Sequence, residues 1–212
     1  MTKDTGSKLP VAREDRAIHR SLMAYATRRL NARPDISLSP ATATTPPPTI
    51  ASHGAYWTEA AWHALAESAC PFHDARPHAA PGRAAAVFDT LIAHQTPAGH
   101  FLQPSPNDNL ESWWYAELVL LHAVGTRAAV TNDAGAYRAA ERAASYHLNE
   151  TQPDHATSEP WAVFPFLLQP ATQSLAEQLL HNASMAPPSA TSLLLLADAL
   201  YCLRLFIQRG TA

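Results

Sequence analysis

At 212 residues, with 47% hydrophobic and 16% charged residues, the chain has the size and composition of one folded globular domain with a substantial core. Seven glycines are few for a β-rich fold full of tight turns, and eighteen prolines predict frequent breaks between elements. The net charge of −3 divides into +5 over residues 1–33 and −8 over residues 34–212, so the main part of the chain lacks the basic face that nucleic acid requires.

The N-terminal part is predicted to be a helical arm followed by a linker. Residues 11–30 combine an apolar side with several arginines, and the next twenty collect prolines among Ser and Thr. The expected organisation is a basic arm at 1–31, a linker at 32–52 and a helical domain at 53–212. The arm suits an anionic membrane or nucleic acid, or docking on the acidic domain of the chain itself, and we favour the last.

Helical periodicity dominates the rest of the chain. The segment 109–124 is apolar nearly all round, which predicts burial. Thr131 or Asn132 is the expected N-cap of the following amphipathic helix, and Ser189 is expected to open the last one. No useful period-2 run occurs, so we predict an all-α fold of about eight helices, the arm included. Those after the linker are expected at 56–68, 82–95, 109–124, 133–148, 158–168, 171–182 and 189–208.

A weak internal repeat orders these helices. Three times, an amphipathic helix is followed by a polar, proline-containing loop and an apolar segment, which opens near 109, 161 or 189. Stacked α-hairpins require such alternation of half-exposed and buried helices. The pattern predicts an α/α-hairpin repeat array curved into a partial toroid or short solenoid, with its connecting loops along a common edge.

This organisation resembles the α/α-toroid group, which includes terpenoid cyclases and prenyltransferases, six-hairpin glycosidases and toroidal polysaccharide lyases. The resemblance covers roughly residues 55–208. The nearest local likeness to the Asn-Trp-Trp-x-x-Glu-Ile-Gly segment of the lyases is Ser112-Trp113-Trp114-Tyr115-Ala116-Glu117-Leu118. In the lyases the Asn helps to bind the substrate carboxylate and the Trp pair stacks on sugar. Ser112 replaces that Asn and eight helices are too few for a six-hairpin ring, so these enzymes' activities are not expected to transfer.

Acidic and indole side chains gather near the start of the 109–124 helix. At spacings of three to four residues they share neighbouring sides of a helix, where acid groups beside indole faces would suit a sugar. The alternative is that the first of them cap the helix and the tryptophans belong to the core. This candidate site comprises Asn107, Asp108, Glu111, Trp113, Trp114 and Glu117.

The loop at 149–161 is dense in hydrogen-bonding groups. Asp154 could orient the imidazole of His155 and make it a usable base. The alternative is a structured turn in which Thr157 or Ser158 caps the next helix and Glu159 complements its dipole. The ligand-binding candidates of this segment are Asn149, Glu150, Gln152 and Trp161.

Metal and membrane signals are weak. Cys70, His73 and His78 have metal-like spacing, but an exposed loop is the favoured interpretation, so no metal and no cofactor are predicted. The two cysteines form no disulfide framework, and the most apolar stretch, 193–207, is too short to span a bilayer. We expect a cytoplasmic protein that does not bind membranes.

The leading functional hypothesis is a ligand-binding or carbohydrate-active helical domain. Its groove would be lined by the loops 99–111 and 149–161, with the tryptophans as stacking surfaces and a small molecule or saccharide as ligand. If the domain is catalytic, His155 is the expected base, aligned by Asp154, with Glu111 or Glu117 as the second titrating group. The competing hypothesis, nearly as strong, is a non-catalytic scaffold of solenoid type that holds a protein partner.

Overall fold

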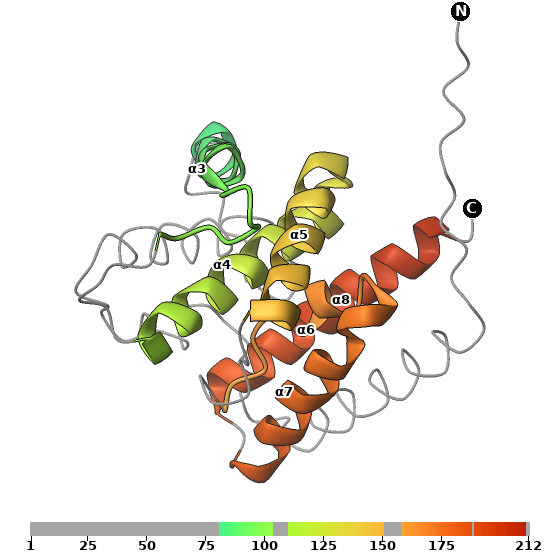
Figure 1. Cartoon of the computed structure of the whole chain (residues 1–212). Coiled ribbons are helices and arrows are strands. Elements are labelled where there is room, and N and C mark those ends of the chain that lie inside the picture. The colour runs from blue at the N-terminus through green and yellow to red at the C-terminus, as the bar shows by residue number, and fades with distance from the viewer. Residues whose placement is uncertain (1–80, 104–109, 151–157, 188, 211–212) are drawn as a thin grey trace, which may run out of the picture.

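In a computed structural model the described part of the chain comprises residues 81–103, 110–150, 158–187 and 189–210, and it is helical without a strand. The all-α prediction is confirmed there. The predicted arm, linker and 56–68 helix lie outside these residues. The helices, labelled in Figure 1, are α3 (Pro81–His94), α4 (Leu110–Thr131), α5 (Ala134–Glu150), α6 (Val163–Phe166), α7 (Gln173–Met185) and α8 (Ala190–Gly210), with a 3₁₀ turn, η2 (Pro170–Thr172), before α7.

Helix α4 is the centre of the described fold. It packs against α5, α6 and α8, and every residue from Ala116 to Thr126 is buried. The prediction that this helix is buried on most sides is confirmed, although it runs to Thr131 instead of ending near residue 124. Gly125 allows α6 to approach closely, because a Cβ there would lie 2.3 Å from a ring carbon of Pro165.

Helices α5 and α7 each bury one side and expose the other. The buried side of α5 consists largely of alanines, which have little volume and let it lie close to α4. The buried side of α7 includes Leu175, Ala176, Leu179 and Leu180. Half-buried α5 and α7 therefore alternate with the buried α4 and the buried face of α8.

The N-cap of α5 differs from the prediction, which was Thr131 or Asn132. The N-cap of α5 is Asp133, whose carboxylate Oδ1 accepts hydrogen bonds from the N–H groups of Gly135 at 2.7 Å and Ala136 at 3.2 Å. Thr131 is the last residue of α4, and Asn132, with φ of 56°, makes the left-handed turn after it. Left-handed backbone angles are typical of the residue that follows a helix, whereas an N-cap residue has extended angles.

The segment before α6 also differs from the expectation. The predicted helix at 158–168 is reduced to Val163–Phe166, and its N-cap is Ala162, with φ of 56°, rather than Ser158. A helix from 158 would have placed Pro165 in its interior, where the ring clashes with the preceding turn. Glu159 instead accepts hydrogen bonds from the hydroxyls of Ser189, at 2.8 Å, and Ser192 at the start of α8. Ser189 opens α8 as predicted, with Oγ accepting the N–H of Ser192 at 2.9 Å.

Among the described helices, none combines the length and apolar character needed to cross a membrane. Asp198 and Arg204 lie within the largely apolar sequence of α8. Asp198 is buried in the described fold, where it faces α4 rather than solvent.

Candidate functional site

The loop between α3 and α4 is anchored on α5. The side-chain amide of Gln95 donates hydrogen bonds to the carbonyl oxygens of Gly99, at 2.6 Å, and Ala139, at 2.8 Å. Gly99 has φ of +116°, and a Cβ there would lie 2.7 Å from the carbonyl oxygen of Arg142. Glycine is therefore required twice, for the backbone conformation and for the close approach of the loop to α5.

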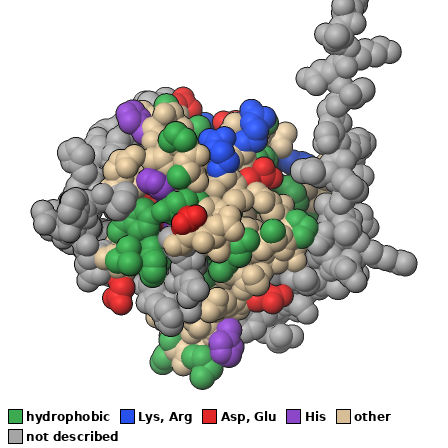
Figure 2. Space-filling view, viewed as in Figure 1, with side chains coloured by type: hydrophobic (Ala, Val, Ile, Leu, Met, Phe, Trp, Pro, Cys, Tyr) green, Lys and Arg blue, Asp and Glu red, His purple; other side chains and the backbone are tan. Residues whose placement is uncertain are grey.

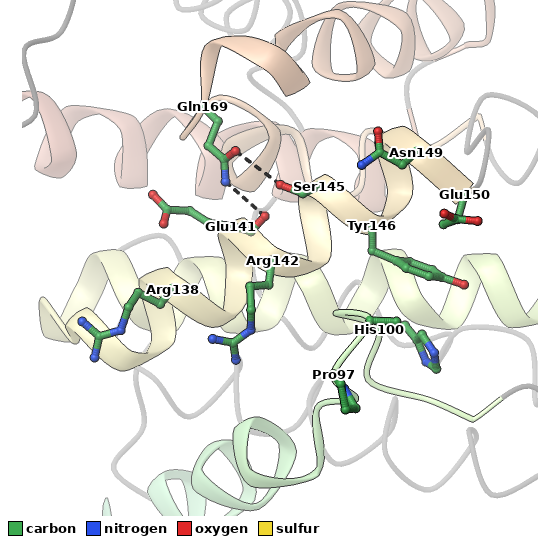
Figure 3. Close-up of a pocket in the computed structure, with 11 residues that line it drawn as sticks. Pro97, His100, Arg138, Glu141, Arg142, Ser145, Tyr146, Asn149, Glu150 and Gln169 are labelled. Carbon is green, nitrogen blue, oxygen red and sulfur yellow. Dashed lines mark hydrogen bonds between the residues drawn. The ribbon is translucent and has the colours of Figure 1, made fainter.

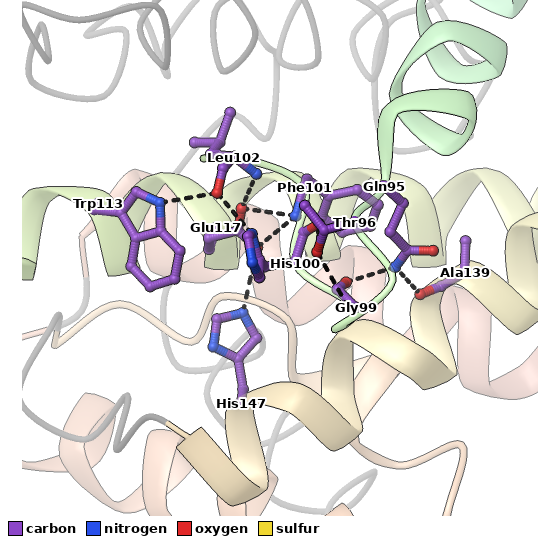
Figure 4. A network of polar contacts seen from close by, with 10 residues as sticks. All are labelled: Gln95, Thr96, Gly99, His100, Phe101, Leu102, Trp113, Glu117, Ala139 and His147. Carbon is purple, nitrogen blue, oxygen red and sulfur yellow. Dashed lines mark hydrogen bonds and ion pairs between the residues drawn. The ribbon is translucent and has the colours of Figure 1, made fainter. Parts of the chain in front are cut away.

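The same loop is anchored on α4 through a buried carboxylate. Glu117, fully buried, accepts the N–H of Phe101 at 2.9 Å and 3.1 Å and also that of Leu102 (Figure 4). Nε2 of His147, on α5, lies 3.7 Å from Oε2 of Glu117. One carboxylate thus joins two helices and the loop, and the backbone N–H groups compensate for its burial.

His100 is held between these anchors. Its Nδ1 lies 2.7 Å from the carbonyl oxygen of Leu102, which also accepts a hydrogen bond from Nε1 of Trp113 at 3.2 Å. The centre of the imidazole lies 4.8 Å from that of the Tyr146 ring and 5.9 Å from that of Trp113. Hydrogen bonding and ring contacts together fix the orientation of this imidazole.

A hollow of about 850 Å³ lies over the exposed side of α5, beside this loop (Figure 3). Its walls come from the loop, from α5 between Arg138 and Glu150, and from the segment between α6 and η2. The lining is mostly polar: Pro97, Ala98, His100, Arg138, Glu141, Arg142, Ser145, Tyr146, Asn149, Glu150 and Gln169. Figure 2 shows basic and acidic side chains close together on this face of the molecule.

Several lining side chains are fixed by hydrogen bonds. Arg142 donates to the side-chain oxygen of Gln95. Gln169 donates to the carbonyl oxygen of Glu141 at 3.1 Å and accepts from the hydroxyl of Ser145 at 3.3 Å. These bonds hold the lining in a defined arrangement before any ligand arrives, which lowers the conformational entropy that binding would cost.

The electrostatics of the lining are mixed rather than one-sided. Two arginines and two glutamates give it no net formal charge. Partial burial raises the pKa of the Tyr146 phenol, and the nearby carboxylates of Glu117 and Glu150 raise it further. Tyr146 is therefore a neutral hydroxyl at physiological pH, able both to donate and to accept a hydrogen bond.

The hollow brings together part of the predicted site. Asn149 and Glu150 line it, and Glu117 lies beneath the loop that forms one wall. Trp113 supports the same loop from within the core. Glu111 is exposed in the first turn of α4, and Trp114 is half-buried against the core. The predicted residues outside the described part are Asn107, Asp108, Gln152, Asp154 and His155.

Trp161 lies in the core at another place. Its ring makes edge-to-face contacts with Tyr115, at 5.9 Å between centroids, and His122, at 5.5 Å. Nε2 of His122 lies 3.5 Å from Oδ2 of Asp198, and both side chains are buried between α4 and α8. This second buried pair is separate from the lining of the hollow.

Most of the lining was not identified from the sequence. Arg138, Arg142, Ser145 and Asn149 recur every three to four residues along α5, so they share one exposed face, and this spacing could have revealed them. The loop 99–111 was expected to line a groove, but the position of His100 within it depends on how the loop docks on two helices, for which the sequence offered no local signal. Helical charge spacing thus identifies one wall but not the opposite one.

No group of three or more His, Cys, Asp or Glu side chains suited to a metal ion occurs among the described residues. The Cys70, His73 and His78 cluster lies outside them. Comparisons with models of protein families, with curated proteins and with solved structures give no match for this chain. The function is therefore argued from the geometry of the hollow.

Proposed function

We propose that this protein is a ligand-binding helical domain whose hollow over α5 takes an uncharged, hydroxyl-rich molecule of the saccharide type. The observation that carries the proposal is the charge-balanced lining, in which two arginines, two glutamates, two side-chain amides and two hydroxyls surround one hollow. Each sugar hydroxyl both donates and accepts hydrogen bonds, so mixed donors and acceptors match it better than a lining of one sign would.

Ring surfaces in the hollow support the same proposal. Tyr146 and His100 contact each other at the junction of the loop and α5. An aromatic face beside hydrogen-bonding groups suits a pyranose, which has apolar C–H faces and a polar edge. This role, which the sequence suggested for the tryptophans, is proposed here for Tyr146.

We place the site at one edge of an α/α-hairpin array that is curved into a partial toroid. Half-buried and buried helices alternate along the described chain, as such an array requires. Both the loop before α4 and the end of α5 reach the hollow. These two features support the proposed architecture and the proposed common edge.

The scaffold hypothesis has less support on the described surface. A protein-binding concavity would present contiguous apolar side chains. The large apolar side chains exposed there lie on three different helices, at Leu110, Met185 and Ile207. A polar small molecule therefore fits better than a protein partner.

Thermal-shift measurements on the full chain with neutral oligosaccharides test the proposal. Asn149→Ala and Glu150→Gln change exposed lining residues and should leave the fold intact. Glu177→Gln, on the exposed side of α7, is the matched control. We expect at least one oligosaccharide to raise the melting temperature of the parent and the control, and to do so less for both lining variants. Equal shifts in all four proteins would refute the site.

A further inference from the structure

We propose that Nε2 of His100 accepts a hydrogen bond from the ligand in this hollow. His100 would thereby select ligands that direct a hydroxyl group at this nitrogen. The proposal rests on the proposed function for its ligand class. Its structural part, the tautomer of His100, can be tested without any ligand.

The tautomer follows from one contact. A carbonyl oxygen can only accept a hydrogen bond, so Nδ1 of His100, 2.7 Å from the oxygen of Leu102, must carry the proton. A neutral imidazole has one N–H, and its other nitrogen is then an acceptor. The lone pair of His100 is therefore on Nε2.

The surroundings of His100 hold this arrangement in place. The carbonyl of Leu102 is fixed because the N–H of the same residue is bound by buried Glu117, and because Trp113 donates to the same oxygen. The rings of Trp113 and Tyr146 flank the imidazole. Turning the ring over would place a C–H group against the carbonyl and lose the hydrogen bond.

The acceptor matters because His100 is only 9% exposed while it lines the hollow. A ligand that covers Nε2 without donating a hydrogen bond would remove water from this nitrogen and leave it unsatisfied. A hydroxyl in that position satisfies it. His100 therefore favours ligands with a hydroxyl there over analogues that have an ether or a C–H group, by roughly tenfold or more in affinity.

The first test is ¹⁵N NMR of the histidine side chains in the full chain. Long-range ¹H–¹⁵N correlations distinguish the Nδ1–H tautomer from the commoner Nε2–H form, and the His100 signals are assigned by their loss in the His100→Asn variant. We expect the Nδ1–H form at neutral pH. An Nε2–H tautomer, or a mixture of the two, would overturn the proposal even if saccharides bind.

The second test uses two variants that separate the two ring nitrogens. His100→Asn keeps an N–H group near the position of Nδ1, and His100→Gln instead places an amide near the position of Nε2. Binding is measured by calorimetry with maltotriose, cellotriose and xylotriose as probes. For a trisaccharide that binds the parent, His100→Asn should weaken binding about tenfold or more, and His100→Gln should restore part of the loss.

The outcomes distinguish this inference from the function on which it rests. If a trisaccharide binds both variants as tightly as the parent, the acceptor role of His100 is wrong while the binding function stands. If no trisaccharide binds the parent, the saccharide function and the ligand role of His100 both fail. A cooperative thermal transition of His100→Asn without ligand, measured alongside, shows that any loss of binding is not a loss of fold.

Discussion

Nε2 of His147 lies 3.7 Å from Oε2 of Glu117, and neither side chain is exposed to solvent. The pair joins α5 to α4 beneath the loop that carries His100. Glu117 also accepts hydrogen bonds from the backbone N–H groups of Phe101 and Leu102, so its carboxylate fixes the position of the loop relative to the two helices. The shape of the hollow therefore depends on a buried side chain that does not line it.

Removing this carboxylate should destabilise the protein strongly. Glu117→Ala leaves the buried N–H groups of Phe101 and Leu102 without their acceptor and removes the carboxylate beside His147, so we expect the free energy of unfolding to fall by about 3–5 kcal/mol. Urea denaturation followed by circular dichroism measures the change. Glu177→Ala, at an exposed position, is the control and should change it by less than about 0.5 kcal/mol. Similar values for the two variants would contradict the role of Glu117.

A side chain at Gly99 should disturb both the loop and the site. Gly99→Ala meets a backbone with φ of +116° and a carbonyl oxygen at 2.7 Å, so we expect a loss of about 1–3 kcal/mol in stability. Because the loop would have to move away from α5, the NMR signals of His100 should also shift. Ala98→Gly, at the neighbouring exposed position, is the control, and unchanged His100 signals in Gly99→Ala would count against this docking.

The close approach of α4 and α6 predicts that a larger residue at Gly125 lowers the stability of the fold by overpacking. Gly125→Ala would place a Cβ 2.3 Å from the Pro165 ring, and overpacking of this sort costs about 1–3 kcal/mol. Gly210→Ala provides the control, because its added Cβ would meet no atom of another part of the described chain within 4 Å. Thermal denaturation should show a lower melting temperature for the first variant only. Equal melting temperatures would mean that α4 and α6 are not so close.

The sequence predicted the helices well because their signals are local. The apolar run of α4 and the amphipathic spacing of α5 each lie within one segment of the chain. The described helices begin and end within a few residues of the prediction, except at the end of α4 and the start of α6. The apolar pattern predicted a helix over 158–168, but Pro165 is not tolerated in a helix interior, and α6 is limited to Val163–Phe166. At the start of α5, Asp133 rather than Asn132 is the N-cap, because Asn132 forms the left-handed turn that ends α4.

The site was harder to predict because it depends on distant contacts. Asn149 and Glu150 were predicted as polar residues of the loop that follows a helix; both lie instead at the end of α5, and both line the hollow. The opposite wall exists because Glu117 binds backbone groups fifteen and sixteen residues earlier in the chain. Such contacts leave no periodic pattern. The same pairing of an acid with tryptophans that suggested a sugar site is, for Glu117 and Trp113, an anchor for the loop.

Alkaline pH should destabilise the protein through its tyrosines. Burial is the main cause that raises the pKa of Tyr115, Tyr137 and Tyr146 in the folded chain. The folded state then holds these protons to higher pH than the unfolded chain does. Their contribution to stability is complete below the ordinary tyrosine pKa of about 10 and is lost as the pH rises through the raised values.

Ultraviolet titration of the phenolate band measures the pKa values of the tyrosines directly. The native protein should titrate at higher pH than the protein in urea, and Tyr146→Phe should remove one of the late groups. Glu150→Gln should lower the pKa of Tyr146, because a negative charge that disfavours the phenolate is removed. A native titration that coincides with the one in urea would contradict the raised values.

The most direct test of the proposed site is to map saccharide binding by NMR on the full chain. Backbone amide signals are followed while neutral trisaccharides are added to saturation. We expect saturable shifts that cluster at Ala98 to His100, at Glu141 to Glu150 and at Gln169, the walls of the hollow. Shifts that cluster instead on α7 or α8, or no shift with any trisaccharide at millimolar concentration, would contradict a saccharide site over α5.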